Sequence, residues 1–321
     1  GTTGQPKGAM LSHRNLMAMT QSYFASVDTI EPGATLLHAA PMSHGSGLYA
    51  FPTIAAGAHQ VVSQSGSFEP EEILQLIKHY PQVSMFAAPT MIKRMVETPA
   101  EKDENTDNLK VMIYGGGPMY VADIKVAMAR FGNKFAQIYG QGETPMTISC
   151  LNRADHLGRD DLPLDELLAS VGCAQVPVEI RIADEKGQAL PDGEVGEILV
   201  SGDTVMRGYW QNPEATAKTI VDGWLYTGDM GMLNAQGYLT LKDRSKDLII
   251  SGGTNIYPRE VEEILLEHPD IIEVSVIGKA DPEWGEEVIA FVVQRETATL
   301  DKAQLDAFCI DNMARFKRPK Q

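Results

Sequence analysis

The sequence contains little cysteine and no long apolar run. Its three cysteines, Cys150, Cys173 and Cys309, lie far apart and form no CxxC pair. This spacing argues against a structural zinc site and favours a reducing compartment. No apolar stretch approaches the length of a membrane-spanning helix. We therefore expect a cytoplasmic protein without a membrane span.

Positive charge is also scarce. The 321 residues include 27 Lys and Arg against 43 Asp and Glu, which gives a formal net charge of −16. Nucleic acids and anionic membranes are bound by basic surfaces, so this balance argues against both as partners. It does not exclude a nucleotide, because one triphosphate needs only a local group of N–H donors and a few cations.

The pattern of apolar residues divides the chain into three parts. Residues 1–170 alternate short apolar runs with helix-like stretches, which indicates α/β layers. Residues 171–243 show period-two strands between turns and indicate a β-rich subdomain of the same large domain. Residues 244–321 are mixed and indicate a small α+β domain. We expect strands at 59–64, 110–117, 178–182, 196–202, 237–243, 271–278 and 286–294, and helices at 69–80, 258–269 and 301–313.

A loop rich in glycine and hydroxyl groups opens the sequence. Gly1 and Gly4 allow backbone N–H groups to approach an anion closely. Thr2 and Thr3 add hydroxyl donors, and Lys7 adds a mobile cation. The order differs from a Walker A loop, which ends in Gly-Lys-Ser/Thr. Taken alone, the loop fits phosphate binding or an ordinary surface loop.

Two later stretches carry groups suited to a nucleotide. YGQGET at 139–144 offers the ring of Tyr139 and the carboxylate of Glu143, and carboxylates are ligands that Mg²⁺ takes. YTGDMG at 226–231 places Asp229 in a predicted tight turn, where its carboxylate is suited to accept hydrogen bonds from ribose hydroxyls. A helix cap or a surface ion pair explains each acidic residue equally well without a ligand.

A charged stretch follows at 241–262. It joins Arg244, a linker at 242–247 and the pair Gly252–Gly253 to the start of a predicted helix. Pro258 takes the first position of that helix, which suits a residue without an N–H donor. We expect the linker to precede a separate C-terminal domain. A glycine turn at a strand end is the alternative explanation for the glycine pair.

Together, and in this order, these stretches resemble the signature of the adenylate-forming superfamily of AMP-dependent synthetases and ligases. That superfamily includes acyl-CoA synthetases, adenylation domains of peptide synthetases and beetle luciferases. The resemblance covers nearly the whole chain. It implies a large N-terminal domain and a small mobile C-terminal domain. It also implies a fragment that lacks the N-terminal part of the large domain and the C-terminal motif with the catalytic lysine.

The resemblance implies a role for each candidate residue. Lys7, His44 and Glu143 are the implied catalytic residues, with Glu143 holding Mg²⁺ and His44 near the acyl group. Lys246 is the implied hinge, and Gly252 and Gly253 line the implied coenzyme A channel. The residues implied around ATP are Thr2, Thr3, Gly4 and Lys7 at the outer phosphates, Gly115, Gly116, Gly117 and Pro118 against adenine and the acyl group, Tyr139, Gly140 and Gln141 in the adenine motif, Thr144 at the α-phosphate, and Asp229 and Arg244 at the ribose.

The activity implied is ATP-dependent activation of a fatty or aryl carboxylic acid to an acyl-adenylate, followed by transfer to coenzyme A. One alternative is an adenylation domain that loads an amino acid or aryl acid onto a carrier protein, and another is a luciferase-type oxidation. Residues 41–51 lack the aspartate with which amino-acid-activating members usually hold the substrate ammonium, which favours a plain acid and coenzyme A. A nucleotide-binding module without adenylation activity is the alternative from another class. The identity of the acid and a homodimeric state stay open.

Overall fold

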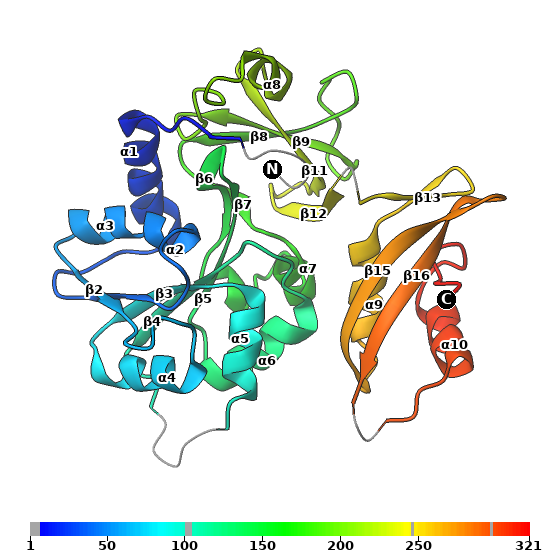
Figure 1. The fold of residues 1–321 in the computed structure, drawn as a ribbon, viewed down its shortest axis with the longest axis horizontal. Coiled ribbons are helices and arrows are strands. Elements are labelled where there is room, and N and C mark those ends of the chain that lie inside the picture. The colour runs from blue at the N-terminus through cyan, green and yellow to red at the C-terminus, as the bar shows by residue number, and fades with distance from the viewer. Residues whose placement is uncertain (1–6, 100–104, 245–246, 296–297) are drawn as a thin grey trace.

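The computed structural model describes residues 7–99, 105–244, 247–295 and 298–321, except for the side chain of Arg244 (Figure 1). Three sheets of seven, five and four strands organise this part of the chain. The larger part contains the first two sheets, and the third sheet belongs to a smaller lobe near the C-terminus (Figure 1). None of the helices in the described ranges is both long and apolar enough to cross a membrane.

The seven-stranded sheet has the order β2-β1-β3-β4-β5-β6-β7, parallel from β2 to β5 and antiparallel from β5 to β7. Successive side chains point to opposite faces, so Leu37 and Met112 enter one core cluster while Leu36 and Ile113 enter another. The strands are β1 (Thr35–His38), β2 (His59–Val62), β3 (Val83–Ala87), β4 (Leu109–Tyr114), β5 (Phe135–Gln141), β6 (Thr144–Leu151) and β7 (Cys173–Ala174).

Helices cover both faces of this sheet, as expected for an α/β layer structure. α4 begins with Pro70 at its first position and buries Ile73, Leu74 and Ile77 against the sheet, as the sequence predicts. The helices on this face are α4 (Pro70–His79), α5 (Pro89–Glu97), α6 (Val121–Phe131) and α7 (Leu164–Ala169). On the other face are α1 (His13–Ser22), the π-helix η1 (Tyr23–Val27), α2 (Gly45–Leu48) and α3 (Ala50–Ala55), while the short 3₁₀ helix η2 (Asp155–Leu157) follows β6.

The second sheet confirms the predicted β-rich pattern but corrects one detail. Asp229 lies within the long strand β11 rather than in a tight turn. The pairing of β11 with β9 is irregular between Tyr226 and Met230, and Gly228 there has φ +73°, which favours glycine. The elements are β8 (Val178–Ala183), β9 (Gly196–Gly202), α8 (Pro213–Thr219), β10 (Ile220–Val221), β11 (Trp224–Leu233) and β12 (Leu239–Arg244).

The C-terminal lobe is an antiparallel sheet with two helices. Its core joins Val261 and Leu265 of α9 to Val276 and Val288 of the sheet. Pro258 opens α9, which confirms the predicted helix start. The elements are β13 (Ile249–Ser251), β14 (Thr254–Ile256), α9 (Pro258–Leu266), β15 (Ile271–Asp281), β16 (Gly285–Gln294) and α10 (Lys302–Asn312).

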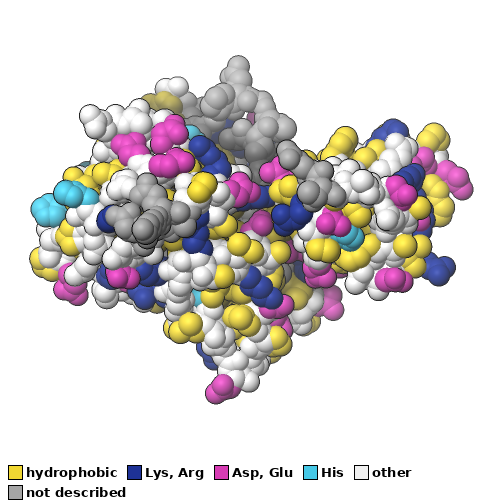
Figure 2. Space-filling view, turned by 90° about the horizontal axis from the view of Figure 1, so that it is seen from below, with side chains coloured by type: hydrophobic (Ala, Val, Ile, Leu, Met, Phe, Trp, Pro, Cys, Tyr) yellow, Lys and Arg dark blue, Asp and Glu magenta, His cyan; other side chains and the backbone are white. Residues whose placement is uncertain are grey.

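Charges on the surface are mixed. On the face shown in Figure 2, Lys and Arg side chains are scattered among Asp and Glu side chains and form no continuous basic surface. Several basic residues near the C-terminus have acidic partners: Lys317 contacts Glu260, and Arg318 contacts Asp306 at 3.1 Å. Neither of these two basic side chains is therefore freely solvated.

Candidate functional site

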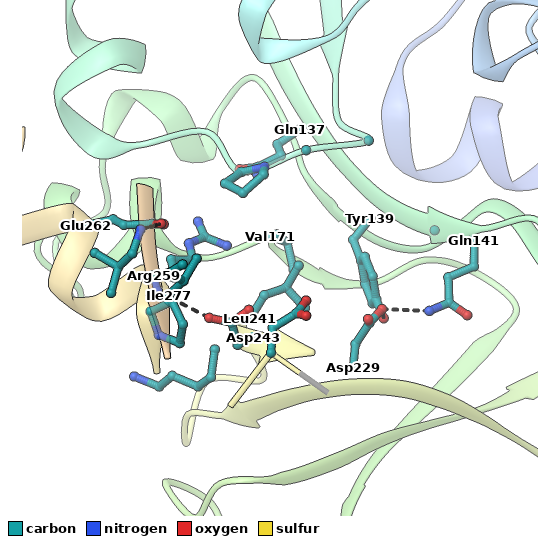
Figure 3. Close-up of a pocket in the computed structure, with 18 of the residues that line it drawn as sticks. Gln137, Tyr139, Gln141, Val171, Asp229, Leu241, Asp243, Arg259, Glu262 and Ile277 are labelled. Carbon is teal, nitrogen blue, oxygen red and sulfur yellow. Dashed lines mark hydrogen bonds between the residues drawn. The ribbon is translucent and has the colours of Figure 1, made fainter. Parts of the chain in front are cut away.

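A cleft of about 660 Å³ lies where the large part of the molecule meets the C-terminal lobe (Figure 3). One wall comes from β5, the loop after β4 and strands β11 and β12, and the other from α9 and β15. The predicted site residues that line the cleft are Gly116, Gly117, Pro118, Tyr139, Gly140, Gln141 and Asp229. The structure therefore brings these residues, which are far apart in the sequence, to one cleft.

The carboxylate of Asp229 is the centre of the hydrogen bonds in the cleft. The Tyr139 hydroxyl donates to Asp229 Oδ2 at 2.6 Å, and Gln141 Nε2 donates to the same oxygen at 2.6 Å (Figure 3). Gln141 Nε2 also reaches the Thr227 carbonyl at 3.0 Å, and the Asp229 N–H donates to Thr227 Oγ1 at 3.1 Å. These bonds join the end of β5 to β11 and fix the direction of the carboxylate.

A second carboxylate lies close to Asp229. The N–H of Gly228 donates to Glu197 Oε1 at 2.9 Å. Burial raises the pKa of Glu197, and the negative charge of Asp229 raises it further. The two carboxylates repel each other. The end of the cleft at Asp229 therefore favours groups that donate hydrogen bonds or carry positive charge.

The end of the opening loop pairs with a distant segment at 207–210. Met10 N–H donates to the Gly208 carbonyl at 2.9 Å, and Trp210 N–H donates to the Gly8 carbonyl at 2.7 Å. This pairing holds Lys7 Nζ 4.4 Å from the centre of the Tyr209 ring, in a cation–π arrangement. The described end of the predicted phosphate loop is thus anchored to the large part of the molecule.

Tyr209 also connects Lys7 to Glu143. Its hydroxyl donates to Glu143 Oε1 at 2.5 Å, in the turn between β5 and β6. Burial and the Glu143 hydrogen bond raise the pKa of Tyr209 to about 12, so the phenol stays a donor at neutral pH. The predicted cation and the predicted metal ligand therefore lie on either side of one aromatic residue.

No group of three or more His, Cys, Asp or Glu side chains suited to a metal occurs in the described ranges. Glu143 therefore offers a single carboxylate rather than a protein cage. One carboxylate together with substrate phosphates and water is a common arrangement for Mg²⁺. The residues present fit that type of site.

Some predicted residues lie outside the cleft. Thr144 is fully buried, with its hydroxyl 2.9 Å from the Thr204 hydroxyl, so its predicted contact with the α-phosphate needs a rearrangement. Gly115 lies against β5, where an added Cβ would approach the Ile138 carbonyl oxygen to 2.5 Å. His44 is exposed and precedes α2.

The glycine pair of the C-terminal lobe forms the turn between β13 and β14 and does not line the cleft. Gly252 and Gly253 have φ values of +57° and +77°, and an added Cβ on Gly252 would meet the Trp284 ring at 2.8 Å. Thr2, Thr3, Gly4 and Lys246 lie outside the described residues. The backbone of Arg244 is described, and its Cα pairs with that of Asp229 between β11 and β12.

Four functional candidates were missed by the sequence reasoning. Tyr209 belongs to an RGYW stretch that matches none of the motifs described above. Asp243, Arg259 and Glu262 also line the cleft (Figure 3), and Arg259 N–H donates to Asp243 Oδ2 at 3.2 Å. No motif indicates that α9 faces the cleft.

The C-terminal lobe docks through a small set of polar contacts. The Tyr120 hydroxyl donates to Glu262 Oε2 at 2.7 Å, while Glu262 Oε1 accepts from the Val276 N–H at 2.8 Å. Lys93 Nζ donates to the Ile272 carbonyl at 2.9 Å and lies 3.7 Å from a carboxylate oxygen of Glu273. These contacts hold α9 and β15 against the loop before α6 and against α5.

Known proteins are similar to this chain in sequence and in fold. Residues 1–210 match the family described as AMP-binding enzyme, and residues 260–321 match the AMP-binding enzyme C-terminal domain. The chain is 34% identical to a medium/long-chain-fatty-acid–CoA ligase, FadD8, of Mycobacterium tuberculosis, covering 100% of this chain and 54% of the relative. It is 35% identical to a feruloyl-CoA synthase of an Amycolatopsis species, covering 100% of this chain and 63% of the relative.

Solved structures agree with this relationship. The amide bond synthetase McbA from Marinactinospora thermotolerans superimposes with a TM-score of 0.90 at 34% identity, covering 99% of this chain and 63% of that one. ATP-bound MatB from Rhodopseudomonas palustris gives a TM-score of 0.89 at 33% identity, covering 100% of this chain and 61% of that one. The chain thus spans between about half and two thirds of the length of these proteins. On its sequence match and its fold, this chain belongs to the AMP-binding enzyme family.

Proposed function

We propose that the protein activates a carboxylic acid with ATP, giving an acyl-adenylate and pyrophosphate, and then transfers the acyl group to coenzyme A as an acid–thiol ligase. The observation that carries the first step is that Tyr139 and Gln141 both donate hydrogen bonds to Asp229 in the cleft. The glycine loop, at residues 116–118, lines the same cleft. The coenzyme A ligases among the relatives support the second step.

We place the nucleoside of ATP against the wall formed by β5 and β11. The Asp229 carboxylate is held by two donors before any ligand arrives, so binding costs little reorganisation. It accepts hydrogen bonds from the ribose hydroxyls, with Arg244 as its proposed partner at the ribose. Gly116 and Gly117 have no side chains and let the backbone approach the adenine closely.

The phosphates then lie toward the group formed by Lys7, Tyr209 and Glu143. Acid activation brings a carboxylate to the α-phosphate, and both are anions, so the site must supply positive charge and orientation. Lys7 supplies a cation that leaves the Tyr209 ring for the outer phosphates, together with Thr2, Thr3 and Gly4. Glu143 would hold Mg²⁺, which neutralises phosphate charge when bound. Thr144 at the α-phosphate and His44 near the acyl group complete the proposed site.

The second step needs a different arrangement of the C-terminal lobe. The turn of Gly252 and Gly253 lies away from the cleft, so a channel for the pantetheine arm along these glycines requires rotation of the lobe. We propose Lys246 as the hinge between the large domain and the C-terminal domain. The large domain comprises the parts 1–170 and 171–243, and the C-terminal domain comprises residues 244–321. The docking contacts of Tyr120 and Lys93 would break in this rotation.

The test uses the full-length protein with ATP, Mg²⁺ and a panel of fatty and aryl acids, with and without coenzyme A. We expect acid-dependent formation of AMP and pyrophosphate, and an acyl-CoA product by mass spectrometry. AMP formation that gives no thioester with coenzyme A supports loading of a carrier protein instead. ATP binding without acid-dependent AMP supports a nucleotide-binding module.

The hinge is tested separately with Lys246→Pro. This variant should keep acid-dependent pyrophosphate release and lose transfer to coenzyme A from preformed acyl-adenylate, because proline restricts the backbone rotation. Lys242→Pro is not a suitable control, since Lys242 lies within β12. Lys246→Ala is the matched control, because it removes the side chain and keeps the backbone free. Unchanged transfer in Lys246→Pro overturns the assignment.

A further inference from the structure

A small, partly open cavity lies on the face of the seven-stranded sheet covered by α1, α2 and α3. Its free space is about that of a single water molecule. The residues around it are mostly apolar and come from α1, η1, α2, α3 and β6, with one more from the segment after β7: Met19, Tyr23, Leu48, Tyr49, Met146 and Gln175.

One polar group of this cavity lacks a partner. Tyr49 is 3% exposed, and its buried hydroxyl has no hydrogen-bond partner among the described residues. Its polar neighbours are satisfied: Gln175 Nε2 donates to the Met146 and Ser149 carbonyls at 3.0 Å each, and Tyr23 is hydrogen-bonded to Ser84. A buried hydroxyl without a partner is destabilising, so this position favours a ligand that supplies an acceptor.

Met146 lies next to both the cavity and the cleft. It lines the cavity, and its Cα lies 2.5 Å from the position that a Cβ on Gly140 would take, while Gly140 lines the cleft. Met146 also has φ +59°, an unfavourable conformation for a side chain of this size. Its flexible side chain can move aside at little cost, which would join the two spaces.

The wall between the glycine loop and the cavity is aromatic. The Tyr49 and Phe86 rings stack with their centres 5.9 Å apart. The Phe86 ring lies 3.5 Å from the Cβ position of Gly45 and 3.9 Å from that of Gly116, so it faces the side where the acid is proposed to bind. An acid reaching past Met146 would therefore contact a flat apolar wall and then the single hydroxyl.

We infer that the substrate carries a small hydrogen-bond acceptor, an ether, carbonyl or hydroxyl oxygen, at the end remote from its carboxylate, and that Tyr49 donates to this oxygen. This inference rests on the proposed acid activation and narrows its substrate class. Burial raises the pKa of Tyr49, so the phenol remains a donor throughout the neutral range.

The experiment compares acids that differ only in an oxygen and a methylene: para-methoxycinnamic acid against para-ethylcinnamic acid, and a short ω-keto acid against its alkane analogue. Binding to the full-length protein is measured by calorimetry, and AMP formation is measured in parallel. We expect the wild type to favour the oxygen-bearing member of at least one pair by about tenfold, as one neutral hydrogen bond allows. Tyr49→Phe should remove this preference. Tyr23→Phe is the control and should keep the preference, because the hydroxyl that it removes already has a partner in the protein.

The melting temperature checks the unliganded state. Tyr49→Phe should melt at the same temperature as the wild type or higher, whereas a clear decrease means that the hydroxyl already has a partner and overturns the inference. Equal binding within both pairs, a preference unchanged in Tyr49→Phe, or no binding of any of the four acids also overturns it. AMP formation without the preference leaves the proposed function intact. A Tyr49-dependent preference without AMP formation contradicts the proposed function alone.

Discussion

The wall of the cleft built from β5 and β11 differs from the wall built from α9 and β15 in how it joins the rest of the molecule. In the first wall, Tyr139 and Asp229 are 90 positions apart and are joined at 2.6 Å within continuous sheets. The second wall brings Arg259 and Glu262 to the cleft on a separate lobe, which docks through a few side chains such as Tyr120 and Lys93. The first wall is therefore fixed in its geometry before a ligand binds. The second wall is held by a few side-chain contacts that can break when the lobe moves.

The docking surface also contains carboxylates in unfavourable surroundings. Burial raises the pKa of Asp123 and that of Glu263, and their acidic neighbours Glu97, Glu273 and Glu267 raise them further. Lys93 and Arg259 oppose these shifts. Burying these ionisable groups costs free energy, so this docking surface can separate readily. The first wall lies within continuous sheets and is not expected to separate.

The largest effect is expected in the fixed wall, at Gly140. An added Cβ there would lie 2.5–2.8 Å from backbone atoms of Met146, which cannot move without distorting β6. Gly140→Ala should lower the free energy of unfolding by about 3 kcal/mol, as overpacking against backbone does. Gly142→Ala is the control, because no atom lies within 4 Å of its Cβ position. Equal stability of the two variants in denaturant titrations would contradict the close packing of this wall.

Removal of the charge at the centre of the fixed wall should mainly affect nucleotide binding. Asp229→Asn weakens the acceptor shared by Tyr139 and Gln141 and should raise the KM for ATP by about tenfold to a hundredfold, the range for hydrogen bonds to a charged group. Asp222→Asn, an exposed change in the turn between β10 and β11, is the control. An unchanged KM for ATP in Asp229→Asn would remove Asp229 from the site.

A smaller effect is expected at Tyr209. Tyr209→Phe loses the hydrogen bond to Glu143 and keeps the ring beside Lys7, whereas Tyr209→Leu loses both. Tyr209→Phe should raise the Mg²⁺ concentration for half-maximal rate by about fivefold, since a hydrogen bond of about 1 kcal/mol orients the carboxylate. Tyr209→Leu should in addition raise the KM for ATP. Identical Mg²⁺ titrations for the wild type and Tyr209→Phe count against a metal at Glu143.

The docked wall should respond to pH. Asp123 and Glu263 have raised pKa values when the lobe is docked, so the docked state binds more protons than the undocked state. Docking should therefore be strongest near the ordinary carboxyl pKa of about 4 and weaken as the pH rises through the raised values. Fluorescence energy transfer between labels on the two lobes measures this change, which Asp123→Asn together with Glu263→Gln should flatten. A docked fraction that grows as the pH rises would contradict the expected pH dependence of docking.

Much of the fold could be predicted from local patterns. The helices at 70–79 and 258–266 begin with proline at the predicted position, and their apolar faces are buried. Strands β8 and β9 follow the predicted alternation. The glycine before Asp229 predicts a turn, but the pairing of Asp229 with Arg244 of β12 continues strand β11 through this position.

The site could be predicted only in part, because its contacts depend on distant segments. The motifs point to Tyr139, Gln141 and Asp229 one by one, whereas the hydrogen bonds that join them appear only in the structure. Tyr209 gave no motif signal, since its role comes from the pairing of 207–210 with the end of the opening loop. The unpartnered hydroxyl of Tyr49 depends on three-dimensional packing and cannot be read from the sequence.

The central claim is that the wall around Asp229 binds ATP for acid activation. Its most direct test is ATP–pyrophosphate exchange by the full-length protein in the absence of coenzyme A, because this exchange requires a reversible acyl-adenylate and no movement to the second step. The account predicts exchange that depends on an added carboxylic acid and falls by about tenfold or more in Asp229→Asn. Exchange that is independent of acid, or unchanged in Asp229→Asn, would contradict it.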